Sequence, residues 1–295
     1  MNKLFYLEND ALRVGISPLG AEMQSIYDKN GGYSVMKSDD DPTWNEYSPI
    51  LFPVCGRLWE FTTVINDRCY PISIHGFTAG APFTVAELTS TRAVLSLTDS
   101  PELLENTYPF PFLLTITYTL EDNALITEAT VENRGAAPMP FTIGFHPGFN
   151  LSVGGSRQED AYLEFPAEAD PKAWRLTLSG YLLRGTDPYP LQEGQRIPVR
   201  KEMFRGNTCV FLENTAGEVT LCSHSSPRKV RVSYDGFPYL GLWQPEDERA
   251  SFLCIEPWMG SPDYEGEITP LVEKRDMRML APGTSESFSY RITVL

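Results

Sequence analysis

A strict alternation of apolar and polar side chains near the middle of the chain constrains its fold more than any other feature. Between positions 112 and 120, apolar residues occupy every even position, and threonines fill most of the odd ones. Because successive side chains of a strand point to opposite faces, this period of two predicts a half-buried antiparallel strand. The polar segment 121–123 then turns the chain into a second strand at 124–131, which completes a hairpin.

Further short strands are expected along most of the chain. They lie at 83–88, 93–98, 209–213, 218–222, 229–234, 238–243, 252–256 and 287–294. The 22 glycines and 24 prolines are spread throughout and would interrupt long helices. This pattern predicts an all-β fold, a large antiparallel β-sandwich that forms one domain over residues 1–295. The least regular region, 157–205, is expected to be a long insertion over one face.

The charge balance limits the partners. Against 24 Lys and Arg stand 39 Asp and Glu, a formal net charge of −15, which disfavours nucleic acid and anionic membrane surfaces and leaves a small neutral ligand. The chain begins with no basic-then-apolar leader and has no apolar stretch of membrane-spanning length, so we expect a cytoplasmic protein. Five cysteines without a CxxC pair predict reduced thiols rather than disulfides or structural zinc.

Four short segments combine polar groups with aromatic and glycine neighbours, as binding clefts do. Arg57 lies in an apolar stretch, where its guanidinium requires a carboxylate or a polar ligand. His75 precedes a glycine that permits close approach of another backbone or a ligand. His146 ends an apolar strand before Pro and Gly turn the chain. Glu256 falls at the end of a buried-looking strand, where burial without a cation would raise its pKa and suit a general base or acid.

Each segment also has a purely structural interpretation. Arg57 would form a structural salt bridge, and His75 would be a satisfied core histidine. The carboxylate of Glu256 would accept hydrogen bonds from backbone N–H groups or pair with Arg57. His224 is most simply an exposed loop residue. The three histidines show no metal-ligand spacing, although a metal site assembled from distant strands stays open. The chain has no GxSxG, GxGxxG or P-loop sequence, so the usual sequence motifs of α/β-hydrolases, dinucleotide-binding proteins and NTPases are missing.

The order of these segments resembles the aldose 1-epimerase (galactose mutarotase) family, and most of all its LacX-type branch. The motifs are FPVCGRL at 52–58, HGF at 75–77, GFHPGF at 144–149, FPYLGLW at 237–243 and CIEPW at 254–258. The resemblance extends from an N-terminal strand at 12–19 to the C-terminal strand and covers nearly the whole chain.

The resemblance implies a galactose mutarotase-like supersandwich that interconverts the α and β anomers of a free aldohexose without a cofactor or metal. Glu256 would take the proton of the C1 hydroxyl, and His146 would protonate the ring oxygen. His75 would hydrogen-bond the sugar near the reacting centre, and Arg57 would hold a hydroxyl or the oxygen. Trp243 or Trp258 would stack on the sugar, although a core position suits either equally well.

Two positions depart from the family pattern. Members of the branch often read HGFAR where this chain has Ala79, so a basic side chain is missing. Relatives often carry an aspartate where this chain has Asn207, whose amide would bind sugar hydroxyls without charge-assisted hydrogen bonds.

Three alternatives remain beside the mutarotase. One is a mutarotase of hexose 6-phosphates, which the missing basic residue and the acidic charge disfavour. Another is a non-catalytic sugar-binding or sensing protein with the same cleft. The third is a glycoside hydrolase, which requires a second cleft carboxylate; Asp263 is the nearest in sequence, but it more simply caps a loop. The expected partner is a carbohydrate, bound by a monomer or homodimer.

Overall fold

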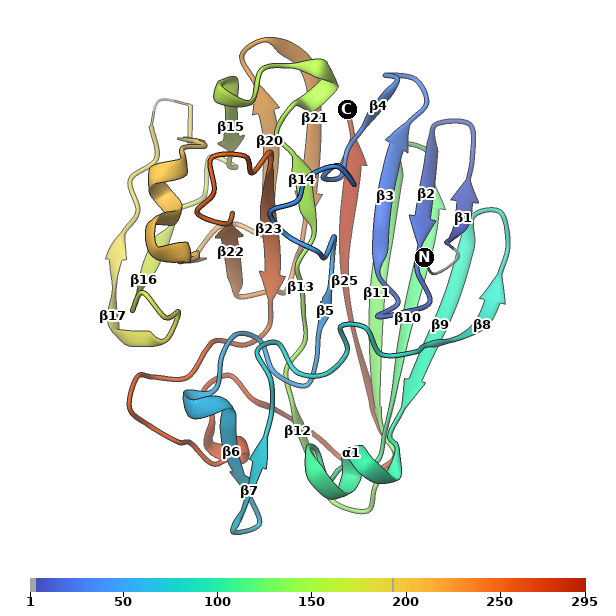
Figure 1. Ribbon diagram of the computed structural model, residues 1–295, viewed down its shortest axis with the longest axis vertical. Coiled ribbons are helices and arrows are strands. Elements are labelled where there is room, and N and C mark those ends of the chain that lie inside the picture. Colours follow the sequence, from blue (N-terminus) through green and yellow to red (C-terminus); the bar gives the residue numbers. More distant parts are fainter. Residues whose placement is uncertain (1–3, 193) are drawn as a thin grey trace.

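The computed structural model describes residues 4–192 and 194–295, with the side chain of Asn207 excepted. Most of the chain forms two large antiparallel sheets (Figure 1). The first has nine strands in the order β18 (Arg196–Pro198), β15 (Ala161–Glu164), β20 (Glu218–Ser223), β21 (Ser226–Ser233), β25 (Ser285–Val294), β11 (Ala124–Asn133), β10 (Phe112–Glu121), β9 (Arg92–Thr98) and β8 (Thr84–Leu88). The second has eight, in the order β17 (Leu182–Pro188), β16 (Lys172–Leu176), β19 (Val210–Glu213), β22 (Tyr239–Trp243), β23 (Phe252–Trp258), β13 (Gly144–Phe145) and β5 (Ile50–Leu51), with β14 (Gly148–Asn150) also paired to β23.

The predicted central hairpin is confirmed and is longer than expected. Strands β10 and β11 pair over ten residues each, from Phe112 opposite Asn133 to Glu121 opposite Ala124. Only two residues form the turn, and Asp122 there has a positive φ of 49°, as tight hairpin turns require. The apolar residues at even positions of β10 are buried and form one side of the core.

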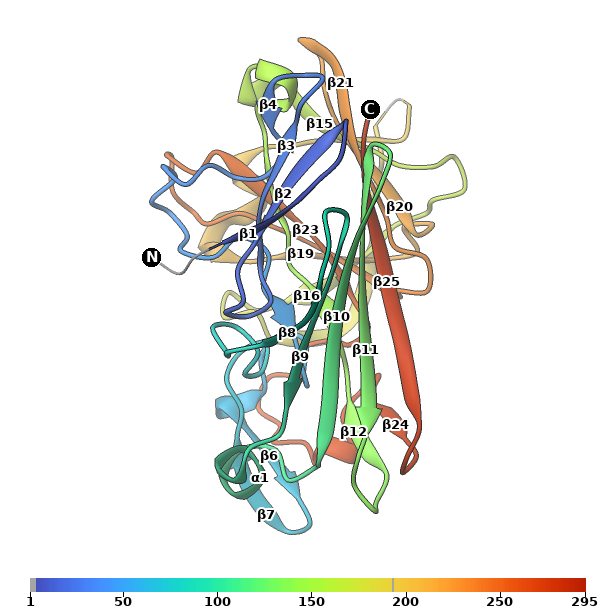
Figure 2. The same cartoon turned by 90° about the vertical axis from the view of Figure 1, so that its right-hand side faces the viewer.

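The core fills the space between the two sheets. Figure 2 shows the long strands β10, β11 and β25 beside the layer that contains β19 and β23. Aromatic rings connect the layers: Phe145 of β13 contacts Tyr290 of β25, with 4.6 Å between ring centroids. Leu253 and Ile255 of β23 belong to this core, so the alternate residues of β23 face the other side of the sheet.

Smaller elements complete the fold. A four-stranded sheet, β1 (Phe5–Glu8), β2 (Leu12–Ile16), β3 (Met23–Asp28) and β4 (Tyr33–Ser34), lies in front of β9–β11 in Figure 1. Two pairs follow, β6 (Thr62–Ile65) with β7 (Arg68–Pro71) and β12 (Met139–Phe141) with β24 (Arg278–Leu280). Among the described residues, one α-helix is present, α1 (Pro101–Asn106). The short 3-10 segments there are η1 (Trp59–Phe61), η2 (Val153–Gly155), η3 (Gln158–Asp160), η4 (Lys201–Asn207) and η5 (Leu271–Glu273). In the described part of the chain, no helix is long and apolar enough to cross a membrane.

The region 157–205 differs from the expected insertion over one face. It supplies edge strands to both sheets, β15 and β18 to the nine-stranded one and β16 and β17 to the eight-stranded one. Its strands are short and interrupted by Pro, Gly and charged residues, and for that reason the alternation was not visible in the sequence. All five cysteines are free thiols.

Candidate active site

A cavity of about 470 Å³ lies on the face of the eight-stranded sheet that is turned away from the nine-stranded sheet. Strands β16, β19, β22 and β23 contribute to its wall, and the loops that carry Arg57, His75 and His146 close it. Leu178 and Gly180 line it, so the region 157–205 contributes to this site. The cavity thus contains six residues that the sequence singled out: Arg57, His75, His146, Trp243, Glu256 and Trp258.

Glu256 lies on β23 with its side chain directed to the cavity side. Its partner in the ladder is Gly241 of β22, where an added Cβ would lie 3.2 Å from the Cβ of Glu256. The glycine therefore leaves room for the carboxyl group. Glu256 is only 1% exposed, and neither of its oxygens meets hydrogen-bond geometry with any described residue. Burial raises the pKa of Glu256 well above its usual value; the indole N–H of Trp258 lies close enough to oppose this rise but does not cancel it.

His146 follows β13 and reaches the same point from the neighbouring strand. Its Nε2 lies 3.2 Å from Oε2 of Glu256. Burial lowers the pKa of His146 to about 3. The imidazole is enclosed by aromatic rings, with centroid distances of 5.0 Å to Trp44 and 5.6 Å to Trp243.

The pKa shifts of His146 and Glu256 act in opposite directions and together determine the protonation state of the pair. Because the pKa of His146 is lowered and that of Glu256 is raised, the pair holds one proton over the whole range between them. Burial favours the form in which both groups are uncharged, the carboxylic acid beside the neutral imidazole. Transfer of that proton across the 3.2 Å gap generates a carboxylate and an imidazolium.

His75 presents one nitrogen to the cavity in a defined tautomer. The backbone N–H of Gly56 donates a hydrogen bond of 3.1 Å to Nδ1 of His75, which leaves the proton on Nε2. The pKa of His75 lies well below its usual value because of burial and then because of repulsion by His146 and Arg57. The adjacent Gly76 has a φ of +86°, and a Cβ there would lie 1.9 Å from the carbonyl oxygen of Phe52, so the predicted close approach of another backbone is confirmed.

Arg57 lines the cavity without the salt bridge that its structural interpretation required. None of the described carboxylates lies within ion-pair distance of its guanidinium, which lies over the ring of Phe61 at 5.5 Å. Trp258 packs against His75 with ring centroids 5.2 Å apart, and its indole nitrogen has no hydrogen-bond partner among the described residues. Both Trp243 and Trp258 line the cavity.

Sequence reasoning missed two residues of this wall. Trp44 is half-buried between His146, Trp243 and Phe252, and Glu46 is a second carboxylate in the cavity. Burial and the neighbouring Glu22 raise the pKa of Glu46. Both lie in an irregular segment, and their only sequence signal was their place just before the apolar run that leads to Arg57.

The two positions that depart from the family pattern lie differently. Ala79 does not line this cavity but a neighbouring one of about 610 Å³, and Glu46 lines both. The side chain of Asn207 lies outside the described part of the structure, so its predicted contact with a sugar stays a prediction. His224 is exposed and stacks on Tyr162, with 4.5 Å between centroids, as expected of a loop residue.

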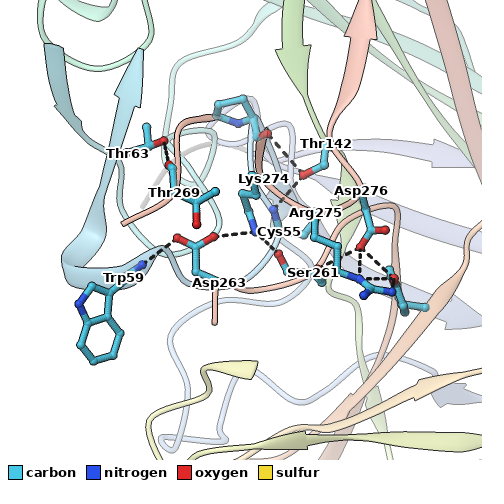
Figure 3. A network of polar contacts seen from close by, with 12 residues as sticks. Cys55, Trp59, Thr63, Thr142, Ser261, Asp263, Thr269, Lys274, Arg275 and Asp276 are labelled. Atoms are coloured by element: carbon cyan, nitrogen blue, oxygen red, sulfur yellow. Dashed lines mark hydrogen bonds and ion pairs between the residues drawn. The ribbon is translucent and has the colours of Figure 1, made fainter. Parts of the chain in front are cut away.

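Asp263 is a structural residue rather than a second cleft carboxylate. It is buried and forms an ion pair of 3.0 Å with Lys274, and both side chains are 2% exposed (Figure 3). Its other oxygen accepts a hydrogen bond from the backbone N–H of Trp59, and its own N–H donates to the carbonyl of Arg57. The hydrogen bonds of Asp263 with the backbone of Trp59 and Arg57 agree with the prediction that it caps a loop. The buried ion pair with Lys274 was not predicted.

One group of side chains in the site has the composition of a metal site. A ring nitrogen of His146, the thiol of Cys254 and a carboxylate oxygen of Glu256 all lie within 4.8 Å of one another. Cys254 and Glu256 lie on β23, whereas His146 follows β13 at a distant position in the sequence, so the group is assembled from distant segments, an arrangement that the sequence left open.

Comparison with known proteins gives consistent results. Residues 3–292 match the sequence model of the family described as aldose 1-epimerase. The chromosomal LacX protein of Lactococcus lactis subsp. lactis is 32% identical over 300 residues, which cover 98% of each chain. The structure of a galactose mutarotase related enzyme from Lactobacillus acidophilus superposes with a TM-score of 0.92 at 27% identity, covering 99% of this chain and 97% of the other. A galactose mutarotase-like protein from Lactobacillus casei gives the same TM-score at 28% identity, covering 99% of this chain and all of the other.

Proposed function

This chain belongs to the aldose 1-epimerase family, and from that premise we propose that it interconverts the α and β anomers of a free aldohexose by acid–base ring opening. The predicted family and the galactose mutarotase-like β-sandwich are both confirmed. The substrate and the roles of the individual residues are our proposal.

The observation that carries the proposal is the pair formed by His146 and Glu256. Ring opening removes a proton from the C1 hydroxyl and adds one to the ring oxygen, and these two oxygens are bonded to the same carbon. An acid and a base that serve both must therefore lie next to each other. The 3.2 Å distance between Nε2 and Oε2 meets this requirement, and burial separates the two pKa values.

The proton steps balance within the pair. With Glu256 as carboxylate and His146 as imidazolium, Glu256 takes the proton of the C1 hydroxyl while His146 gives its proton to the ring oxygen. The electron pair of the broken O–H bond forms the C1=O double bond, and the bond between C1 and the ring oxygen breaks with its electrons on that oxygen. The pair then consists of a carboxylic acid and a neutral imidazole. After rotation about C1–C2, the reverse steps close the ring as the other anomer and restore the starting pair.

The remaining cavity residues would hold the sugar. Nε2–H of His75 is free to donate a hydrogen bond because Nδ1 accepts the one from Gly56. Arg57 offers guanidinium donors that no described carboxylate engages. Trp44 and Trp243 meet edge to face, with 5.6 Å between their centroids, and present apolar surface beside His146 that suits a pyranose ring.

Polarimetry tests the proposal directly. Fresh α-D-glucose and α-D-galactose should approach anomeric equilibrium faster with the protein than in buffer alone. Glu256→Gln should lose this acceleration, whereas Glu102→Gln, an exposed glutamate of α1, should keep it. No acceleration across a panel of aldohexoses would contradict the proposal. If the wild type binds sugar without acceleration and Glu256→Gln binds equally well, the protein is a sugar binder instead.

A glycoside hydrolase is a second candidate because Glu46 supplies the second cavity carboxylate that Asp263 does not. Hydrolysis of nitrophenyl glycosides separates the two reactions. Release of nitrophenol that depends on both Glu46 and Glu256 would establish the hydrolase, and anomerisation without release would establish the mutarotase.

A further inference from the structure

We propose that His146, Cys254 and Glu256 form a binding site for a thiophilic divalent cation such as Zn²⁺, and that the bound ion blocks the acid–base pair. The inhibition rests on the proposed function, whereas binding of the ion does not. Cys254 has no part in the acid–base chemistry and gives the site its sulfur ligand.

The strand geometry brings the three ligands together. Cys254 and Glu256 are two residues apart on β23, so their side chains point to the same face of the sheet. His146 follows β13, which pairs with β23 through Gly144 and Trp258. The three ligand atoms lie within 4.8 Å of one another, and all three residues are buried.

These distances are close to those of a coordinated ion. With metal–ligand bonds of about 2.0–2.3 Å, the ligands of tetrahedral Zn²⁺ lie about 3.4–3.6 Å apart. The nitrogen and oxygen of the pair are already 3.2 Å apart. The largest of the three separations therefore needs to shorten by at most about 1.4 Å.

The ligands are also free to bind. Neither oxygen of Glu256 meets hydrogen-bond geometry with any described residue, and Nε2 of His146 already lies 3.2 Å from Oε2. An ion can reach His146 and Glu256 because both line the cavity, and the buried Cys254 thiol lies within 4.8 Å of their ligand atoms.

Charge balance favours a divalent ion in this buried place. The ion displaces the proton of the thiol and the one proton that the acid–base pair holds, and two protons are released to solvent. One dication, one thiolate, one carboxylate and a neutral imidazole then sum to zero charge, so no net charge is buried. Coordination to a dication is what makes deprotonation of the buried Cys254 thiol favourable.

Co²⁺ serves as the spectroscopic probe because its thiolate complexes absorb in the near ultraviolet and its tetrahedral complexes absorb strongly in the visible. The metal-free protein titrated with Co²⁺ should develop both sets of bands at one ion per chain, and Zn²⁺ should abolish them. Cys254→Ala and Cys254→Ser should lose the thiolate band and bind Zn²⁺ about 100-fold more weakly or worse, since loss of an outer-shell partner alone costs 10–100-fold. Cys222→Ala, a buried cysteine of β20, is the matched control and should bind like the wild type.

Two results would overturn the proposal. One is that the wild type binds no stoichiometric Co²⁺ or Zn²⁺. The other is that the wild type binds the ion without a thiolate band and the Cys254 variants still bind it. Circular dichroism and thermal melting establish that each variant is folded. In the polarimetric assay, Zn²⁺ should inhibit the wild type and Cys222→Ala but spare the Cys254 variants. A protein that anomerises no sugar would refute the proposed function and leave the cobalt titration as an independent test of the site.

Discussion

Glu256→Gln is expected to remove both catalytic groups at once, although it changes only one. Glutamine has the shape of the neutral carboxylic acid that burial favours, so the fold and the affinity for sugar should be preserved. The amide cannot accept the proton of the C1 hydroxyl. It also cannot give a proton to His146, whose Nε2 lies 3.2 Å from Oε2 in the wild type.

The expected loss follows from the pKa of His146. With that value lowered to about 3, about one imidazole in 10⁴ is protonated at pH 7 unless Glu256 supplies the proton. The variant therefore lacks its base and nearly all of its acid. General acid–base catalysis contributes about 10²–10⁴-fold, and we expect the loss in kcat near the upper end of this range.

The pH dependence provides the decisive measurement. The wild-type pair holds one proton from just above pH 3 up to the raised pKa of Glu256, so its rate should be flat over that range. In the variant, the protonated fraction of His146 grows as the pH falls, so its enzymatic rate should rise by about tenfold per pH unit between pH 7 and pH 4. Exchange NMR, with the buffer-catalysed rate subtracted, measures both profiles. A loss below about tenfold, or a variant profile as flat as that of the wild type, would refute the shared-proton argument.

Three further predictions concern the surroundings of the pair. Lys274→Met should lower the free energy of unfolding by about 3–5 kcal/mol in urea denaturation, because it leaves the carboxylate of Asp263 buried without its cation. Adding Asp263→Leu should restore part of this loss. A double variant less stable than Lys274→Met would contradict the reasoning. Glu46→Gln removes a negative charge from the cavity, so the ratio of the rate with glucose 6-phosphate to the rate with glucose, measured by exchange NMR, should rise by about tenfold. An unchanged ratio would place Glu46 away from the ligand. Gly76→Ala should abolish soluble expression because its Cβ would lie 1.9 Å from a backbone oxygen; Gly80→Ala, with a similar positive φ but open space around it, should cost only about 1–2 kcal/mol, and equal effects in the two variants would show that φ alone matters.

The sequence predicted the parts of the fold that depend on local periodicity. The alternation in β10 was sufficient to predict a strand because one face of that strand packs against the core and the other is only partly covered. Apolar and polar residues therefore alternate with burial along it. Strands β16 and β17 were not recognised because β17 lies at the sheet edge and β16 beside it, where few residues are fully buried and the alternation fades.

The candidate site was predictable where a motif marks it and not elsewhere. Glu256 and His146 could be named because each follows an apolar run in the sequence, and the resemblance supplied their roles. Trp44 and Glu46 come from an irregular segment whose place in the cavity depends on contacts with β23 and its neighbours, and no local pattern encodes these. The same applies to the partner of Asp263: the ion pair with Lys274 joins two loop residues that nothing in the sequence connects.

The burial of the pair also bears on the choice between a mutarotase and a sugar binder. A binder needs only hydrogen-bond donors and acceptors, which amides and hydroxyls provide without titrating. Here the sheet instead keeps a carboxyl and an imidazole in contact, with little exposure and without other hydrogen-bond partners among the described side chains. Such an arrangement destabilises the fold unless the two groups remain uncharged in sum, and the single shared proton satisfies that condition. Ring opening and closure both conserve that proton count, so the pair can complete the cycle without exchanging protons with solvent. The feature that makes the buried pair tolerable in the fold is therefore the same feature that suits it to anomerisation.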